Sequence, residues 1–200
     1  SYASDLTDRF SVGINGKYVQ QSIANSHAKG IAIDIGTLFI TPFGFTLGTS
    51  ISNFGPKLRM TGDDLLIGAD VDENIDGNNE SVTGVLSTDY FDLPLVLRIG
   101  VSDQFQLGPR NQIVISADAI SPNDNANYIN AGLKLQLLDG LISLYAGANS
   151  LFLENAESEF SLGGGITIPQ ILNNSLSIHF THEQMKFLGN SQQLSISFNY

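Results

Sequence analysis

The residues best suited to chemistry in this chain are ionisable side chains that stand alone on the polar side of otherwise neutral segments. There are six of them: Asp34, Arg98, Asp118, Lys134, His179 and Glu183. No nucleophile stands beside a general base, and no histidines have metal-ligand spacing, so the sequence predicts no enzyme, no catalytic residue and no cofactor. Two interpretations stay open for the six residues. They form either a polar track for a solute or, the favoured interpretation, ion pairs and hydrogen bonds that fill a narrow interior.

Acidic residues gather in one segment of the chain. The chain has 9 Lys and Arg against 20 Asp and Glu, for a formal net charge of −11. Nine of the acids lie between Arg59 and Arg98, where there is no basic residue at all. Nucleic acid is excluded as a partner, because no basic cluster is present to neutralise phosphates. We expect the segment to bind a protein partner through Asp63, Asp64, Asp70, Asp72, Glu73, Asp76 and Glu80.

The same segment contains a partial calcium motif. Asp72, Asn74 and Asp76 match the first half of a calcium-binding loop, in which alternate side-chain oxygens suit a hard cation. The position that should carry a bidentate Glu is Thr83. We therefore treat the three residues as a weak calcium candidate, assign no metal site, and favour a solvated acidic loop.

The elements that position these residues are predicted to be β-strands. Apolar and polar residues alternate with a period of two along almost the whole chain, and no helix of any length is predicted. The alternation defines eleven strands, near residues 1–5, 10–18, 31–39, 45–52, 95–102, 113–119, 129–137, 142–149, 160–168, 176–183 and 193–200. Most strands have about ten residues, and a tilted strand needs about 9–11 residues to cross a bilayer.

The composition of the two strand faces favours a membrane. Ser, Gly, Asn, Thr and Gln dominate the polar face, whereas the water-exposed face of a soluble sandwich would carry Lys, Glu, Arg and Asp. The other face is apolar and almost free of charge. We therefore predict an all-β, transmembrane, antiparallel up-and-down β-barrel in the cell outer membrane, with its apolar face on lipid. A soluble β-sandwich is the alternative. The chain has no cysteine, which excludes disulfides.

Connection lengths support this prediction because short and long connections alternate. Barrels of the outer membrane have short periplasmic turns and long extracellular loops. Tight turns are predicted at Thr41–Gly44 and Leu138–Gly140, the latter from its Asp-Gly pair. Longer polar connections are predicted at Gln21–Gly30, Met60–Asp92 and Ser121–Asn127, and Met60–Asp92 is expected to be an extracellular loop without secondary structure. Gln104–Asn111 is long for a periplasmic turn and fits the pattern least.

The last strand carries an expected assembly signal. Its apolar residues alternate up to Phe198 and Tyr200. A terminal strand with a final aromatic resembles the signal by which outer-membrane barrels are recognised by the barrel assembly machinery. We expect Phe198 and Tyr200 to act in this recognition.

Four sequence words resemble those of a known family: TDRFSVGINGKYV (7–19), AIDIGTLF (32–39), SISNFGPKL (50–58) and DLPLVLRIGV (92–101). The chain resembles the PorV/PorQ family of outer-membrane proteins, which is related to the FadL-type fatty-acid channels. The resemblance implies a fourteen-stranded barrel, of which about eleven strands are present here. It also implies a role in type IX secretion, with the secretion translocon and secreted proteins as partners. A FadL-like channel for small hydrophobic molecules is the alternative.

The chain departs from that family at its front. The family's Asn-Pro-Ala-Gly word, its plug-like segment and its first strands are missing. We therefore expect residues 1–200 to form the C-terminal portion of such a barrel. An odd number of strands would also leave unpaired edges in lipid.

Overall fold

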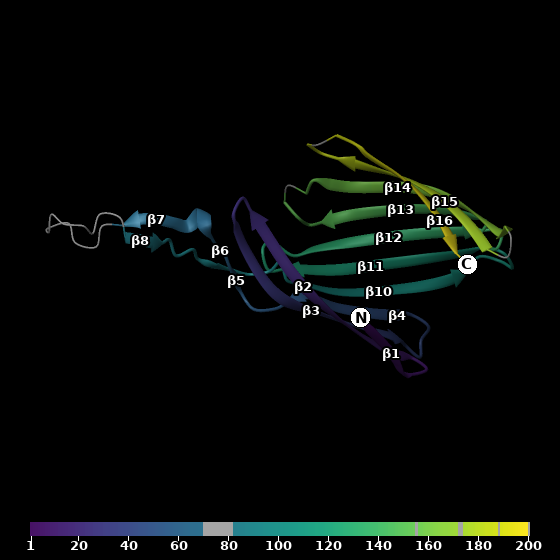
Figure 1. The fold of residues 1–200 in the computed structure, drawn as a ribbon. Helices are drawn as coiled ribbons and strands as arrows, with labels where there is room; N and C mark the ends of the chain where they lie inside the picture. The colour runs from purple at the N-terminus through teal and green to yellow at the C-terminus, as the bar shows by residue number, and fades with distance from the viewer. Residues whose placement is uncertain (70–81, 155, 172–173, 188, 200) are drawn as a thin grey trace.

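One large antiparallel sheet dominates the computed structural model (Figure 1), which describes residues 1–69, 82–154, 156–171, 174–187 and 189–199. Eleven long strands form it in sequence order, each antiparallel to the next. They are β1 (Tyr2–Thr7), β2 (Phe10–Ile23), β3 (Ser26–Ile40), β4 (Thr46–Phe54), β10 (Val96–Gln106), β11 (Gln112–Pro122), β12 (Tyr128–Leu137), β13 (Ile142–Leu151), β14 (Ser158–Ile171), β15 (Asn174–Met185) and β16 (Ser191–Asn199). This confirms the predicted all-β, up-and-down arrangement of eleven strands.

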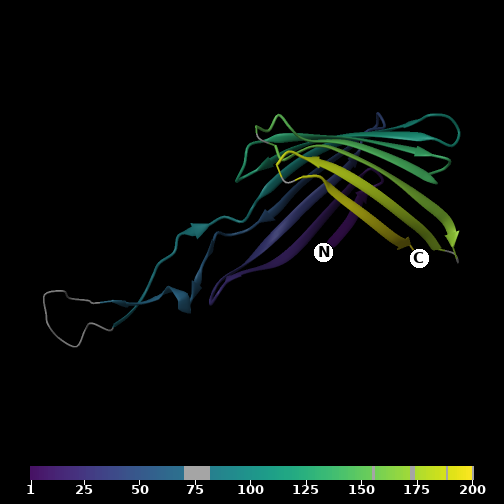
Figure 2. The same cartoon turned by 90° about the horizontal axis from the view of Figure 1, so that it is seen from above.

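The sheet curves into an open trough. Figure 2 shows its two margins, where β1 and β16 lie, on the same side of the arched sheet. Within the described residues β1 pairs only with β2, and β16 only with β15. The described part of the chain contains no helix with the length and hydropathy needed to cross a membrane.

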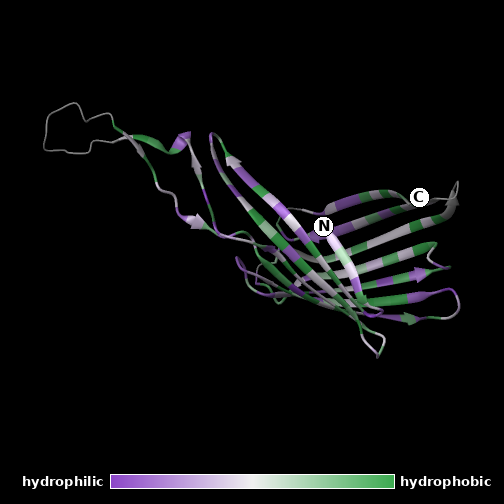
Figure 3. Cartoon of the chain, turned by 60° about the horizontal axis from the view of Figure 1, so that its bottom comes forward, coloured by the Kyte–Doolittle hydropathy of each residue, from purple (hydrophilic) through white to green (hydrophobic). Residues whose placement is uncertain are grey.

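The strand register sorts side chains onto two different faces. One transverse row runs Gly100, Asp118, Asn130, while the row beside it runs Val101, Ala117, Ala131 on the opposite face. Figure 3 shows the resulting bands of hydrophilic and hydrophobic residues along the strands. We call the face of Asp118 the inner wall and the face of Ala117 the outer face.

Two connections on the side of the tight turns interlock. The turn at 138–140 is tight, as predicted, and places Leu138 and Asp139 at φ 55° and 60°. The 107–111 connection reaches across to it. Arg110 Nε donates to Asp139 Oδ2 at 2.7 Å, and Asp139 N donates to the Arg110 carbonyl at 2.8 Å. This latch accounts for the length of the connection that fitted the sequence pattern least.

The prediction of a long connection at Gln21–Gly30 is wrong. Strand β2 continues to Ile23 and pairs with Ser26 at the start of β3, so only Ala24 and Asn25 form the turn. Ala24 takes the left-handed conformation, with φ 48°. The polar run here reflects contact with water rather than the end of strand pairing, because composition reports exposure and not hydrogen bonding.

The prediction that Met60–Asp92 lacks secondary structure is also wrong. We call residues 55–95 the arm. It contains, in order, β5 (Leu58–Arg59), β6 (Thr61–Gly62), the 3-10 turn η1 (Asp63–Leu65), β7 (Leu66–Ala69), β8 (Val82–Val85) and β9 (Tyr90–Phe91). Strands β7 and β8 form an antiparallel hairpin, and β5 pairs with β9 below it. Figures 1 and 2 show that the described part of the arm extends well beyond the end of the sheet.

The base of the arm packs onto the inner wall of β3. Leu58 is 2% exposed and lies against Ala28 and Ala32, with Leu93 completing the cluster. Small residues on β3 are required here, because a Cβ added at Gly30 would lie 2.3 Å from Leu58 Cδ2. Outside this cluster the sheet has few buried apolar side chains, so the arm base is the best-packed core in the described residues.

Replacing Leu58 with alanine should free the base of the arm. Truncating a buried leucine costs about 2–5 kcal/mol, because a cavity remains. Limited proteolysis with trypsin measures this loosening of the arm base directly. Lys57 and Arg59 flank Leu58 and are the last basic residues, and so the last cleavage sites, before Arg98. We expect cleavage at these two sites to accelerate roughly tenfold or more. Leu66→Ala, at a position that is 47% exposed, is the matched control, and equal cleavage of both variants would contradict the packing assignment.

Candidate functional site

The inner wall is the concave face, because its side chains meet across intervening strands. Alternate strands lie about 9.5 Å apart. Nevertheless, the Tyr145 hydroxyl on β13 lies 3.2 Å from His179 Nδ1 on β15, across β14. Lys17 Nζ on β2 donates to Asn53 Oδ1 on β4 at 2.5 Å, across β3. All six ionisable residues predicted for the interior lie on this wall, where the structure separates them into three groups.

The first group surrounds Asp34 at the root of the arm. Lys17 Nζ forms an ion pair with Asp34 Oδ1 at 2.6 Å, and Asn15 Nδ2 donates to Oδ2 at 3.1 Å. The backbone N–H of Asn53 also donates to Oδ1, at 2.8 Å. Asn53 lies in a bulge of β4 with φ 61°, a conformation that asparagine tolerates better than most residues. Asp34 therefore stabilises the bulge of β4 that directly precedes the arm.

The second group surrounds Tyr145. His179 meets its ring edge-on, with 5.8 Å between ring centroids, and Lys134 Nζ lies 5.9 Å from the ring centroid on another side. Gly165 makes room for this contact, because a Cβ there would lie 2.0 Å from His179 Nδ1. The 163–165 glycine run is thus a place of close packing. Nearby, Asn149 Nδ2 donates to Glu183 Oε1 at 3.2 Å.

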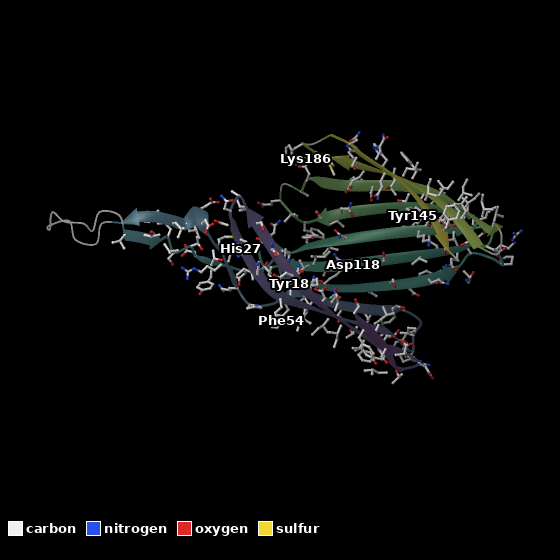
Figure 4. All side chains as sticks on the ribbon, viewed as in Figure 1. Tyr18, His27, Phe54, Asp118, Tyr145 and Lys186 are labelled. Atoms are coloured by element: carbon white, nitrogen blue, oxygen red, sulfur yellow. The ribbon has the colours of Figure 1, made fainter. Side chains whose placement is uncertain are left out.

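The third group is Arg98 with Asp118, and it lines a cavity of about 320 Å³ that we call the wall cavity. Figure 4 labels Asp118 in the middle of the sheet. Gly48 and Gly100 lie side by side in the wall of this cavity. Within the part of the chain that the structure describes, the side chains of Arg98 and Asp118 form no hydrogen bond or ion pair.

Sequence reasoning did not single out Lys17, Asn53 or Tyr145 as members of these groups. Tyr145 carries a visible signal, since it is a lone aromatic on a face of small polar residues. Asn53 carries a weaker one, since it precedes a Phe-Gly-Pro sequence that ends the strand. Contacts across an intervening strand leave no trace in the period of two, because that period reports only which face a side chain occupies.

The predicted partner-binding acids are placed only in part. Asp63 and Asp64 begin η1 at the arm base. The remaining acids of that prediction and the calcium candidate residues lie outside the described residues: Asp70, Asp72, Glu73, Asn74, Asp76 and Glu80. No three His, Asp or Glu side chains of the described residues lie close enough together to hold a metal.

Asp64 ties the arm to the β2–β3 turn. Its two carboxylate oxygens accept from the Asn25 side-chain amide at 3.0 Å and from the Asn25 backbone N–H at 2.8 Å. These bonds, the side-chain bond foremost, hold the pKa of Asp64 below its ordinary value. Together with the Leu58 cluster, they fix the arm at two points.

Phe198, one of the two residues predicted for assembly, lies at the end of the sheet opposite the arm. Phe198 is near the end of β16, where it pairs with Leu176 and is 66% exposed. Tyr200 lies outside the described residues. Their role in assembly stays a prediction.

Comparison with known proteins gives matches among solved structures and none among family models or curated proteins. Among solved structures, the chain is similar to a Pseudomonas aeruginosa FadL homologue, with 13% sequence identity and a TM-score of 0.46. The match covers 98% of this chain and 63% of that one, so this chain spans less than two thirds of that protein's length. Membership of the PorV/PorQ family stays a prediction.

The hydrogen bonds between the Asp64 carboxylate and Asn25 should be lost as the pH falls. A carboxylate whose folded pKa is lowered contributes stability above its unfolded pKa and loses it as pH falls through the folded value. The backbone and side-chain amide NMR signals of Asn25 should therefore titrate with a midpoint below 3.8, the ordinary pKa. In Asp64→Asn they should no longer titrate. A midpoint at or above 3.8 would show that the carboxylate does not accept these bonds.

Proposed function

We propose that this chain forms the wall of an outer-membrane β-barrel whose arm docks a protein partner at the cell surface. In the form that the sequence resemblance favours, the chain is a PorV-like component of type IX secretion, and its arm meets the translocon or secreted proteins. The observation that carries the docking role is the arm itself, which has internal strands and is fixed at its base.

The outer face supports a lipid environment. Large apolar side chains project from it without cover, among them Ile99 at 50% exposure, Leu133 at 40% and Ile166 at 53%. Strands β11, β12 and β13 place no charged residue on this face, because Asp118 and Lys134, the two charged residues that they contain, lie on the inner wall. Water-soluble monomers rarely expose an apolar patch of more than a few hundred Å². Lipid tails cover such a surface without cost.

Strand length is consistent with this proposal. Ten of the eleven long strands have nine or more residues, which is about the length that a tilted strand needs to cross a bilayer. Every backbone group within lipid must be hydrogen-bonded. The proposal therefore requires that the free edges of β1 and β16 be joined in the membrane, either directly or through further strands.

The two halves of the arm are paired with each other, so its described part is not an irregular loop. Its two legs are joined by the pairing of Leu58 with Phe91 and by an ion pair between Lys57 and Asp92 at 3.1 Å. Beyond them, the β7–β8 hairpin exposes apolar side chains such as Leu66 and Val85. The segment from Met60 to Leu97 contains nine acids and no base, so we expect a partner with a basic surface and an encounter rate that falls as salt rises.

The polar inner wall separates this proposal from the channel alternative. A FadL-like channel for small hydrophobic molecules needs an apolar path, whereas glutamines bridge three strands of this wall. Gln104 Nε2 donates to Gln112 Oε1 at 2.9 Å, and Gln112 Nε2 donates to Gln136 Oε1 at 2.7 Å. The apolar cluster around Leu58 is filled by the chain's own side chains.

Removing the hairpin tests the docking role. Leu86 N donates to the Leu65 carbonyl at 2.8 Å, so residues 66–85 can be replaced by an Asn-Gly turn without moving either leg. The retained Asp64 and Leu58 should keep the base folded. We expect this variant to reach the outer membrane at normal levels and to lose partner capture and secretion in the native host.

A second variant tests whether partner capture depends on the negative charge of the arm or on the presence of the hairpin. It keeps the hairpin and changes Asp70, Asp72, Glu73, Asp76 and Glu80 to the corresponding amides. We expect slower capture with a weaker salt dependence in this variant. For the first variant, from which the hairpin is deleted, full secretion and unchanged partner capture would contradict the docking role. Uptake of a hydrophobic solute by this hairpin-deleted protein would support the channel alternative.

A further inference from the structure

We propose that the wall cavity binds a small zwitterion, with Arg98 on its carboxylate and Asp118 on its ammonium group. The inference rests on the proposed function in one respect, namely that the inner wall faces an aqueous interior. The cavity is lined by Thr46, Gly48, Ser50, Arg98, Gly100, Ser102, Ser116 and Asp118, together with Leu38 of β3. Thr37, Thr49 and Val101 also border it but belong to the outer face.

Glycine shapes the floor of this cavity. A Cβ at Gly100 would lie 2.1 Å from Asp118 Oδ1, so the carboxylate lies across β10 over Gly100, and a larger residue there would displace it. Gly48 pairs with Gly100 on the next strand, which keeps the space in front of the carboxylate open over two strands.

Arg98 and Asp118 differ from the other four ionisable residues of the inner wall, whose side chains contact neighbouring side chains. Lys17 pairs with Asp34, Lys134 and His179 contact Tyr145, and Glu183 accepts from Asn149. Arg98 and Asp118 line the same cavity without any such contact among the described residues. Arg98 is exposed and Asp118 is partly exposed, so both charges are accessible to a ligand that enters the cavity.

Their spacing suits a ligand that carries both charges. Asp118 pairs with Gly100, two residues along β10 from Arg98, so the two side chains are diagonal neighbours with about 7–8 Å between their backbones. A planar guanidinium recognises a carboxylate through two parallel hydrogen bonds. The carboxylate of Asp118 offers up to four acceptor sites to an ammonium group. A group with charge of only one sign would leave one of the two residues unsatisfied.

The size and the remaining lining define the ligand further. A volume of about 320 Å³ is at the lower end of small-molecule sites, which span roughly 300–1,000 Å³. The hydroxyls of Thr46, Ser50, Ser102 and Ser116 line it and can donate or accept. This chemistry fits an α-amino acid or a short peptide.

Three probes of similar size test the assignment on the folded full chain in detergent. Alanine carries both charges, propionate only the negative one, and propylamine only the positive one. Saturation-transfer NMR titrations should show alanine binding at least tenfold more tightly than either of the others. In Arg98→Gln, alanine should bind no better than propylamine. In Asp118→Asn, it should bind no better than propionate.

Matched controls keep the result interpretable. Lys134→Gln removes a charge of the same wall outside the cavity and should leave alanine binding unchanged. Arg98→Lys keeps the charge and should retain the preference for alanine over propylamine. Gly100→Ala should abolish binding by displacing the Asp118 carboxylate.

Two results would overturn the proposal. The first is equal binding of all three probes to the unaltered chain, which needs no variant to interpret. The second is unchanged alanine binding in both charge variants. Insertion of the same protein into lipid vesicles is scored separately. Insertion without alanine binding rejects only the zwitterion site, whereas alanine binding without insertion rejects only the barrel proposal.

Discussion

The register of the eleven-stranded ladder is the constraint on which the other features of the structure depend. A slip of one residue between two strands would exchange their inner and outer faces, placing Asp118 or Lys134 among the apolar side chains. Two of the bulges near the ends of strands on the side of the arm are each held by a side chain of the neighbouring strand. Asp34 accepts from Asn53 N, and Asn130 Oδ1 accepts from Ser150 N, both at 2.8 Å. At the opposite end the Arg110–Asp139 latch joins two turns. Register is thus fixed at both ends of the wall.

The glycines of the inner wall leave room for side chains of the neighbouring strands. Where the wall has a glycine, side chains from the neighbouring strands can meet over it or lie across it. Gly165 admits the His179 ring, Gly30 admits Leu58, and Gly100 admits the Asp118 carboxylate. The same residue type therefore supports a packed aromatic group, the anchor of the arm and an open polar cavity. The neighbouring side chain decides which of these results.

The strands, their order and the faces of their residues could be predicted from the sequence, because a period of two directly encodes which face a residue occupies. All six interior ionisable residues were placed on the correct face for this reason. The β2–β3 turn was missed because its flanking residues are polar although they pair. The internal strands of the arm were missed because acids and glycines interrupt their alternation. The unpaired state of Arg98 and Asp118 could not be predicted, since pairing depends on distances between strands that no local pattern contains.

The central claim, that the apolar face of this sheet contacts lipid, can be tested along a single strand. The chain has no cysteine, so single cysteines can be introduced from Ile129 to Gln136 of β12 and labelled with nitrobenzoxadiazole. In vesicles with nitroxide-bearing acyl chains, quenching should be strong at Ile129, Ala131, Leu133 and Leu135. It should be weak at Asn130, Gly132, Lys134 and Gln136. Quenching of the opposite phase, or quenching without alternation, would contradict the account.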